Sequence, residues 1–189
     1  MKKINFLIVS SLVGTTCFVA TSNCTYMQHY IGSSSLEVPT DEIDLLDKFF
    51  NGTIDFSKVN FRYAREGDFD NRSLTIANTV FISADRDCES NWSSCRGILT
   101  HELLHVWQHQ KFGLSYIKNN RTEIYYYNLY EGEFTSYGIE QQAQMVQDYY
   151  GWIFEDKPRI SFCMDCLDYE QDEVIIEIER KLNNAGILP

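Results

Sequence analysis

The chain has 189 residues, of which 44% are hydrophobic and 14% aromatic, a composition typical of a globular protein with a substantial core and not of a disordered one. Its 27 acidic residues outnumber the 16 basic ones and leave a formal net charge of −11 at neutral pH. Because such a surface repels phosphate backbones, the composition argues against nucleic acid as a partner.

The first 22 residues have the features of a secretion signal. A positive start at Met1 to Lys3 is followed by a largely apolar run from Ile4 to Ala20. Ala20-Thr21-Ser22 is a small-x-small cleavage site, so residues 1–22 are predicted to be a signal peptide and the mature chain to begin near Asn23. We therefore expect an exported protein, periplasmic or secreted, with no membrane span after signal removal.

Two alternatives to simple secretion remain at this point. An uncleaved signal would act as an anchor, but a run of about 17 apolar residues is short for a bilayer. A lipoprotein signal would place a lipid anchor on Cys24, although Thr21, Ser22 and Asn23 resemble the usual lipoprotein cleavage box poorly.

The mature chain divides into a lead-in and one predicted domain. Residues 23–39 are polar and serine-rich and are expected to be flexible, whereas residues 40–189 show no repeat and no linker. Thr40 begins a predicted helix that ends at Asn51-Gly52. The alternating segments 59–63 and 74–83 are predicted strands, and such a strand could form the edge along which an extended peptide lies.

The next predicted helix runs from about Cys95 to Lys111, capped by Ser93 or Ser94 and ended by Gly113. It contains His-Glu-x-x-His, and residues four apart lie on one helix face, so His101 and His105 can bind one metal ion. Glu102 can reach a water molecule at the open position of that metal, which makes it the candidate general base. The apolar residues of this helix that are predicted to pack in the core recur with the helical period; they are Leu99, Leu103, Val106 and Trp107.

A catalytic zinc site needs a third protein ligand. The best candidate is Glu140, at the start of a predicted helix from about Gly138 to Ile153, where Ala143 would let the two helices approach closely. Glu131 and Glu133 compete for the role, but rigid elements place ligands better than loops do.

Several further residues are candidates for supporting roles. Asp148 could orient a ligand histidine, and a donor is needed for the oxyanion that develops during hydrolysis. The candidates for the oxyanion donor are His109, Tyr125, Tyr127, Tyr130 and Tyr137.

A last amphipathic helix is predicted from about Tyr169 to Asn183.

The cysteines agree with export into an oxidising compartment. Short loops favour the disulfides Cys88–Cys95 and Cys163–Cys166, with Cys24 left over. The alternative is one structural zinc site built from these four cysteines, but only one pair has the Cys-x-x-Cys spacing.

The segments HELLHVWQHQ (residues 101–110) and EQQAQMVQDYY (residues 140–150), with Tyr-x-Tyr between them, resemble the gluzincin branch of zinc metallopeptidases. More closely they resemble small bacterial metallopeptidase-like domains, some of them attached to Rhs, Vgr and related secretion-associated proteins. The resemblance covers residues 75–152 and implies one zinc ion (Zn²⁺) per chain, a zincin-like α+β fold and hydrolysis of a peptide or protein substrate. In that fold a small sheet packs on an active-site helix pair, with a C-terminal helix.

The leading hypothesis is therefore an exported zinc metallopeptidase with His101, His105 and Glu140 as ligands and Glu102 as general base. The alternative is a metal-stabilised binding or secretion-associated module that cleaves nothing and keeps the ligands for stability. A third hypothesis is an envelope lipoprotein whose attachment at Cys24 matters more than any activity.

Overall fold

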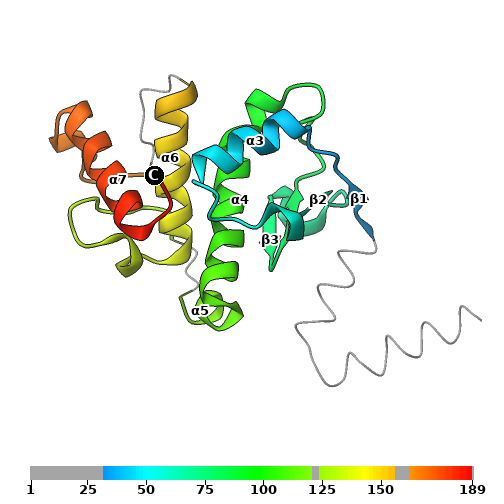
Figure 1. Ribbon diagram of the computed structural model, residues 1–189, viewed down its shortest axis with the longest axis horizontal. Helices are drawn as coiled ribbons and strands as arrows, with labels where there is room; N and C mark the ends of the chain where they lie inside the picture. Colours follow the sequence, from blue (N-terminus) through cyan, green and yellow to red (C-terminus); the bar gives the residue numbers. More distant parts are fainter. Residues whose placement is uncertain (1–31, 121–123, 156–161, 189) are drawn as a thin grey trace, which may run out of the picture.

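The computed structural model describes residues 32–120, 124–155 and 162–188, which form the α+β fold of Figure 1. The predicted signal peptide, the first part of the predicted lead-in and Cys24 lie outside these residues. Within them, no helix has the length and apolar character needed to cross a membrane.

A four-stranded mixed sheet forms one side of the molecule. Its spatial order is β1-β2-β4-β3, with β2 and β4 parallel and the outer pairs antiparallel. All four residues of β4 are buried, as expected for a central strand, and β3 lies at an edge. The strands are β1 (Ser34–Ser35), β2 (Asn60–Tyr63), β3 (Leu74–Ile76) and β4 (Thr79–Ile82).

The prediction of one strand over residues 74–83 is wrong, because the chain reverses in its middle. Ala77 has a φ of 54°, and Ile76 pairs with Thr79, so a two-residue turn joins β3 to β4. Asn78 is a turn-forming residue, but Ala77 in a left-handed conformation is uncommon, which is why the pattern did not reveal the hairpin. The described part of the predicted lead-in contributes β1 at the opposite edge.

The central element is the long helix α4 (Trp92–Phe112), which packs against the sheet on one side and α6 (Ile139–Glu155) on the other (Figure 1). It begins earlier than predicted. Asn91 precedes its first turn, and the Ser94 hydroxyl donates to the Asn91 carbonyl instead of capping the helix. Gly113 ends it as predicted, with a φ of 78° and its N–H donating to the His109 carbonyl.

The other predicted helices are confirmed. Gly186, with a φ of 74°, follows the C-terminal helix, which packs on α6. Besides α6, the confirmed helices are α3 (Thr40–Phe49) and α7 (Gln171–Ala185). The sequence did not predict α5 (Leu114–Asn120) or the short 3₁₀ turns η1 (Phe56–Lys58), η2 (Asp68–Asn71), η3 (Phe134–Ser136) and η4 (Cys166–Asp168).

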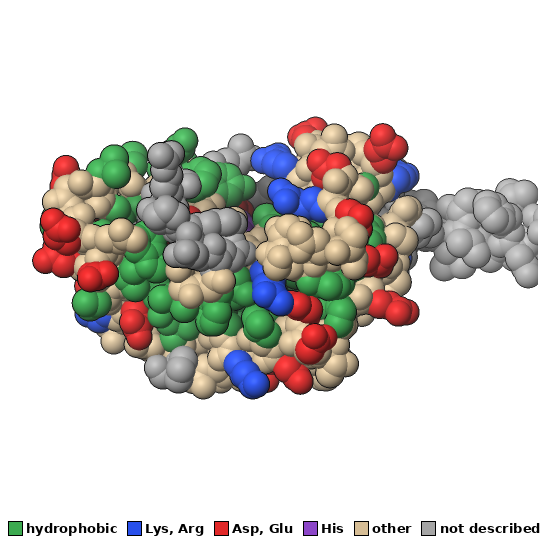
Figure 2. All heavy atoms as spheres, turned by 90° about the horizontal axis from the view of Figure 1, so that it is seen from above, with side chains coloured by type: hydrophobic (Ala, Val, Ile, Leu, Met, Phe, Trp, Pro, Cys, Tyr) green, Lys and Arg blue, Asp and Glu red, His purple; other side chains and the backbone are tan. Residues whose placement is uncertain are grey.

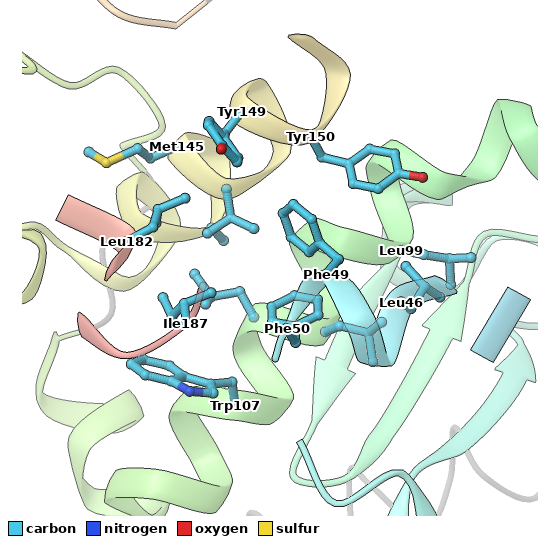
Figure 3. Packing of buried hydrophobic residues seen from close by; sticks show 14 of the residues in the cluster. Leu46, Phe49, Phe50, Leu99, Trp107, Met145, Tyr149, Tyr150, Leu182 and Ile187 are labelled. Atoms are coloured by element: carbon cyan, nitrogen blue, oxygen red, sulfur yellow. The ribbon is translucent and has the colours of Figure 1, made fainter. Parts of the chain in front are cut away.

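One hydrophobic core joins the sheet side to the helical side. Phe49, the last residue of α3, and Phe50, which follows it, point into the space between α4 and α6, and Trp107, Tyr150 and Leu182 belong to the same cluster (Figure 3). Phe50 is completely buried, so its truncation to alanine would cost about 3–5 kcal/mol of stability. The core thus holds the two helices of the predicted site at a fixed separation.

Both predicted disulfides are present. Cys88–Cys95 ties the loop after β4 to the first turn of α4, and Cys163–Cys166 closes a turn beside residues 127–130. The alternative of one zinc site from these four cysteines is therefore wrong, because the thiols are bonded in separate pairs. The two bonds agree with an oxidising compartment.

Candidate metal centre

Three candidate ligands converge between α4 and α6. His101 and His105 lie one turn apart on α4, and Glu140 is the second residue of α6. The Nε2 atoms of both histidines are 3.4 Å from the Glu140 carboxylate oxygen Oε2. His101 and His105 are buried, while Glu140 retains a partly exposed side chain. The predicted trio thus forms one compact His-His-Glu group.

The separations within this group suit a tetrahedral metal ion. Zinc bonds of 2.0–2.2 Å at tetrahedral angles place neighbouring ligand atoms about 3.3–3.4 Å apart. A direct N–H···O hydrogen bond is normally about 2.9 Å long, so the observed 3.4 Å is long for one. Two buried imidazoles and a carboxylate are also a common donor set for zinc. The residues present therefore fit a divalent metal ion.

Gln108 orients His105 for such a role. The His105 Nδ1–H donates to the Gln108 side-chain oxygen at 2.8 Å, a bond that assigns the ring proton to Nδ1 and leaves the Nε2 lone pair facing Glu140. The Gln108 side-chain nitrogen donates to the Gln142 side-chain oxygen at 3.0 Å and to the Ile139 carbonyl. Because Ile139 precedes Glu140, this buried network fixes α4 and α6 relative to each other.

His101 is positioned by packing. Its ring lies 5.9 Å from the ring of Tyr125, and its buried Nδ1 has no hydrogen-bond partner among the residues that the structure describes.

The prediction that Asp148 orients a ligand histidine is wrong. Asp148 accepts hydrogen bonds from the Tyr127 hydroxyl at 2.9 Å and from Gln144 at 2.8 Å, and no hydrogen bond joins it to either histidine in the part of the chain that the structure describes. For His105 the partner position is already occupied by Gln108, one turn further along the same helix, and the Asp148 carboxylate is engaged by Tyr127 and Gln144.

Glu102 lies beside the group and contacts the sheet. Its side chain is buried, and its Oε2 accepts a hydrogen bond from the Thr75 hydroxyl of β3 at 2.8 Å. The same hydroxyl lies 2.9 Å from the Glu102 carbonyl, so Thr75 contacts both ends of the residue. Burial raises the pKa of Glu102, and the nearby histidines and Thr75 oppose that shift only in part. A carboxyl group with a raised pKa holds an abstracted proton more readily.

The ligand candidates perturb one another strongly. Burial raises the pKa of Glu140, but hydrogen bonding and the charges of His101 and His105 outweigh it, so that pKa lies well below its usual range. Burial conversely lowers the pKa of His105, yet contact with Glu140 leaves it above its usual value. This mutual stabilisation of opposite charges marks a place where a cation other than a proton would also be favoured.

A cleft of about 400 Å³ opens onto the group. One wall is formed by α4 and α6, and the other by β3 and the segment before it. Tyr125 also lines the cleft, and burial followed by the negative charge of Glu140 raises the pKa of its hydroxyl. The remaining lining residues include Phe69, Asn71, Arg72, Ser73, Leu74, Arg86, Ile98, Gln144, Gln147 and Phe162.

Tyr125 is the oxyanion-donor candidate that the fold brings to the cleft. The Tyr127 hydroxyl bonds to Asp148, and the Tyr137 hydroxyl donates to the backbone carbonyl of Asn128. The other two candidates lie elsewhere: the Tyr130 ring packs against that of Tyr169, and His109 lines a different hollow with Trp107.

The competing third ligands are outside the group. Glu131 is exposed and accepts a hydrogen bond from Asn128, while Glu133 is paired with Arg180 of α7.

Sequence reasoning missed Gln108 and Thr75. Gln108 follows His105 at helical spacing, a signal that could have revealed it, whereas Thr75 is 27 residues before Glu102 and nothing in the sequence connects them.

Comparisons with protein-family models, with curated protein sequences and with solved structures find no match. The predicted likeness to gluzincins therefore rests on the buried His-His-Glu group and the α+β fold of this chain.

Proposed function

We propose that the protein is a zinc-dependent peptidase in which His101, His105 and Glu140 hold one zinc ion per chain. The observation that carries this proposal is the pair of equal 3.4 Å separations between the histidine nitrogens and the Glu140 oxygen. They match the spacing of neighbouring ligand atoms in a tetrahedral zinc site, and the three residues line the cleft. Zinc suits two imidazoles and one carboxylate better than Ca²⁺ or Mg²⁺, which prefer oxygen ligands.

A zinc ion held by His101, His105 and Glu140 would supply a Lewis acid that polarises a carbonyl group and lowers the pKa of a water molecule. Glu102 acts as general base, taking the proton from the attacking water and passing it to the leaving amine. The raised pKa of Glu102 favours its protonated form between these two proton transfers, and the hydrogen bond from the Thr75 hydroxyl fixes the orientation of its carboxylate. Tyr125, which lines the same cleft, would donate its hydroxyl proton in a hydrogen bond to the developing oxyanion.

The sheet edge at the cleft supports a peptide as the substrate. Among the described strands, β3 pairs with β4 alone, so its other backbone edge is free to accept an extended chain. Strand addition at this edge would place a peptide bond over the metal centre, because Thr75 of β3 contacts Glu102. The function is thus proposed to be hydrolysis of an extended peptide or an unfolded protein segment.

We also propose that this activity operates after export. The predicted signal peptide 1–22 and the disulfides Cys88–Cys95 and Cys163–Cys166 support an exported enzyme, periplasmic or secreted.

The test compares the purified protein with Glu102→Gln in metal content and in cleavage of an end-blocked peptide library. The wild type should contain about one zinc per chain and cleave peptides, whereas Glu102→Gln should keep its zinc and lose about 10²–10⁴-fold in rate. Glu131→Gln, the same change at an exposed loop position, is the control and should match the wild type. Zinc retention without any cleavage by the wild type would favour the non-catalytic metal-stabilised module, and equal activity of Glu102→Gln would refute the mechanism.

A further inference from the structure

Two arginines stand at the mouth of the cleft. Arg72 precedes β3 and Arg86 lies in the loop after β4, so both belong to the sheet wall. Figure 2 shows basic side chains near the middle of one face, on the half of the molecule that holds the sheet. In a chain of net charge −11, these two arginines offset the carboxyl groups of Glu102 and Glu140, which line the same cleft.

The guanidinium groups retain capacity for a ligand. The ion pair of Arg72 is with Asp70 at 3.7 Å, and both side chains are mostly exposed, so solvent screens that pair. Arg86 forms no ion pair within the described ranges, and its side chain is exposed. A guanidinium binds a carboxylate through two parallel N–H···O bonds, a geometry that few other side chains match.

The backbone that presents Arg72 is strained. Phe69, Asp70 and Asn71 have φ values of 55°, 55° and 57°, a left-handed conformation that costs about 1–2 kcal/mol per residue. Local contacts hold it: the Phe69 ring packs on Phe81, and the Asn71 carbonyl accepts a hydrogen bond from Ser83 at 2.9 Å. Phe69, Asn71 and Arg72 all line the cleft, so the strained residues face the place where a substrate would lie.

We propose that Arg72 and Arg86 select peptides that carry a carboxylate within one or two residues of the scissile bond. This inference rests on the proposed peptidase function and names its substrate class. The carboxylate comes either from an Asp or Glu side chain or from a free C-terminus, and both present the same planar anion. The negative charge of the remaining surface weakens the approach of acidic peptides, so the arginines act at short range, as specificity determinants.

Binding of peptide hydroxamates to the zinc-loaded protein tests the proposal without requiring turnover. Three probes share one peptide backbone: a neutral probe with Gln and a C-terminal amide, a probe with Glu in place of Gln, and a probe with Gln and a free C-terminal carboxylate. Titration calorimetry gives each dissociation constant. The variants are Arg72→Gln, Arg86→Gln and their combination, with Lys48→Gln as a matched control that removes one exposed positive charge on α3, away from the cleft.

We expect one anionic probe to bind about tenfold tighter than the neutral probe. Each single arginine variant should lose about threefold of that advantage, the double variant should lose all of it, and Lys48→Gln should keep it. The advantage should also shrink as salt is added. Preference for the Glu probe identifies a side-chain carboxylate as the ligand, and preference for the free carboxylate identifies a chain terminus.

Equal binding of all three probes by the wild type would overturn the proposal, as would a preference that survives in the double variant. Failure of the proposed function gives a different result. If the probes bind with the arginine-dependent preference but no peptide is cleaved, the proposed hydrolysis is contradicted and the proposed recognition is not. Cleavage of a peptide library with no acidic preference would contradict the recognition alone, and binding of no probe would count against both.

Discussion

The two walls of the cleft are built in opposite ways. The helix wall presents the candidate ligands from regular, buried elements that Gln108 and Gln142 tie together. The sheet wall consists of a three-residue strand, a left-handed segment and two exposed arginines. Under the proposed function this difference has a physical reason, because metal ligands need positions fixed by packing, whereas substrate contacts can reside on a more variable segment.

The largest expected effect comes from removing a ligand on the helix wall. Structural zinc sites are worth about 10–16 kcal/mol over four ligands, so loss of one should weaken zinc binding about 10²–10³-fold. We expect this for His101→Ala and Glu140→Ala in a competition titration with a zinc chelator. Arg72→Gln, on the sheet wall, should bind zinc like the wild type. If Glu140→Ala retained full affinity, the third ligand would have to be another group.

Removing the residue that supports His105 should have the next largest effect. Gln108→Ala deletes the acceptor of the His105 Nδ1–H and should reduce zinc affinity about 10–100-fold. It should also cost about 1–3 kcal/mol of stability, because buried polar groups of Gln142 and Ile139 lose their partner. Gln110→Ala on the same helix is the control. The Gln110 side chain contacts Asp55 and Asn78 and not the metal group, so this variant should bind zinc like the wild type. Equal zinc affinity in the two variants would contradict the role of Gln108.

The free energy of unfolding should depend on pH through Asp148 of α6, the second helix of the helix wall. Burial raises the pKa of Asp148 to about 6, although hydrogen bonds from Gln144 and Tyr127 oppose the shift. Because the folded pKa lies above the unfolded one, the native state holds this proton more tightly. The resulting stabilisation is complete below about pH 4 and is lost as the pH rises through about 6.

Asp148→Asn should therefore gain stability relative to the wild type between pH 4 and pH 7, by about 1–3 kcal/mol. Urea unfolding across this pH range measures the difference between the two proteins. Asp44→Asn, at an exposed position of α3, serves as the control and should show a constant difference. A constant difference for Asp148→Asn as well would show that the carboxyl group is not perturbed.

The smallest effect concerns strain in the sheet wall. Asp70→Gly replaces a residue with a φ of 55° by one that tolerates this conformation, so strain relief should stabilise the fold by about 0.5–1 kcal/mol. Asp70→Ala removes the same side chain but keeps the unfavourable φ, and should be less stable than Asp70→Gly by about 1 kcal/mol. Thermal unfolding of the two variants gives this comparison, and equal melting temperatures would argue against strain.

The same contrast explains what the sequence could predict. Helical periodicity located α4 and α6, and the His-Glu-x-x-His spacing together with Glu140 indicated three residues that the fold does bring together. The sheet wall depends on Ala77 and residues 69–71 in left-handed conformations, which only long-range contacts such as Phe69 on Phe81 select. Thr75 was out of reach for the same reason, since its contact with Glu102 arises from how the sheet docks on the helix.

The length of β3 limits how many residues of an extended substrate could pair with its backbone. The strand Leu74–Ile76 spans about 10 Å, so backbone pairing along it engages only two or three residues of an incoming chain. So short a ladder gives little affinity and tolerates almost any amino-acid order. If the proposed function holds, discrimination among targets would come from single contacts beside the scissile bond, and the protein would recognise one local chemical group in many different polypeptides.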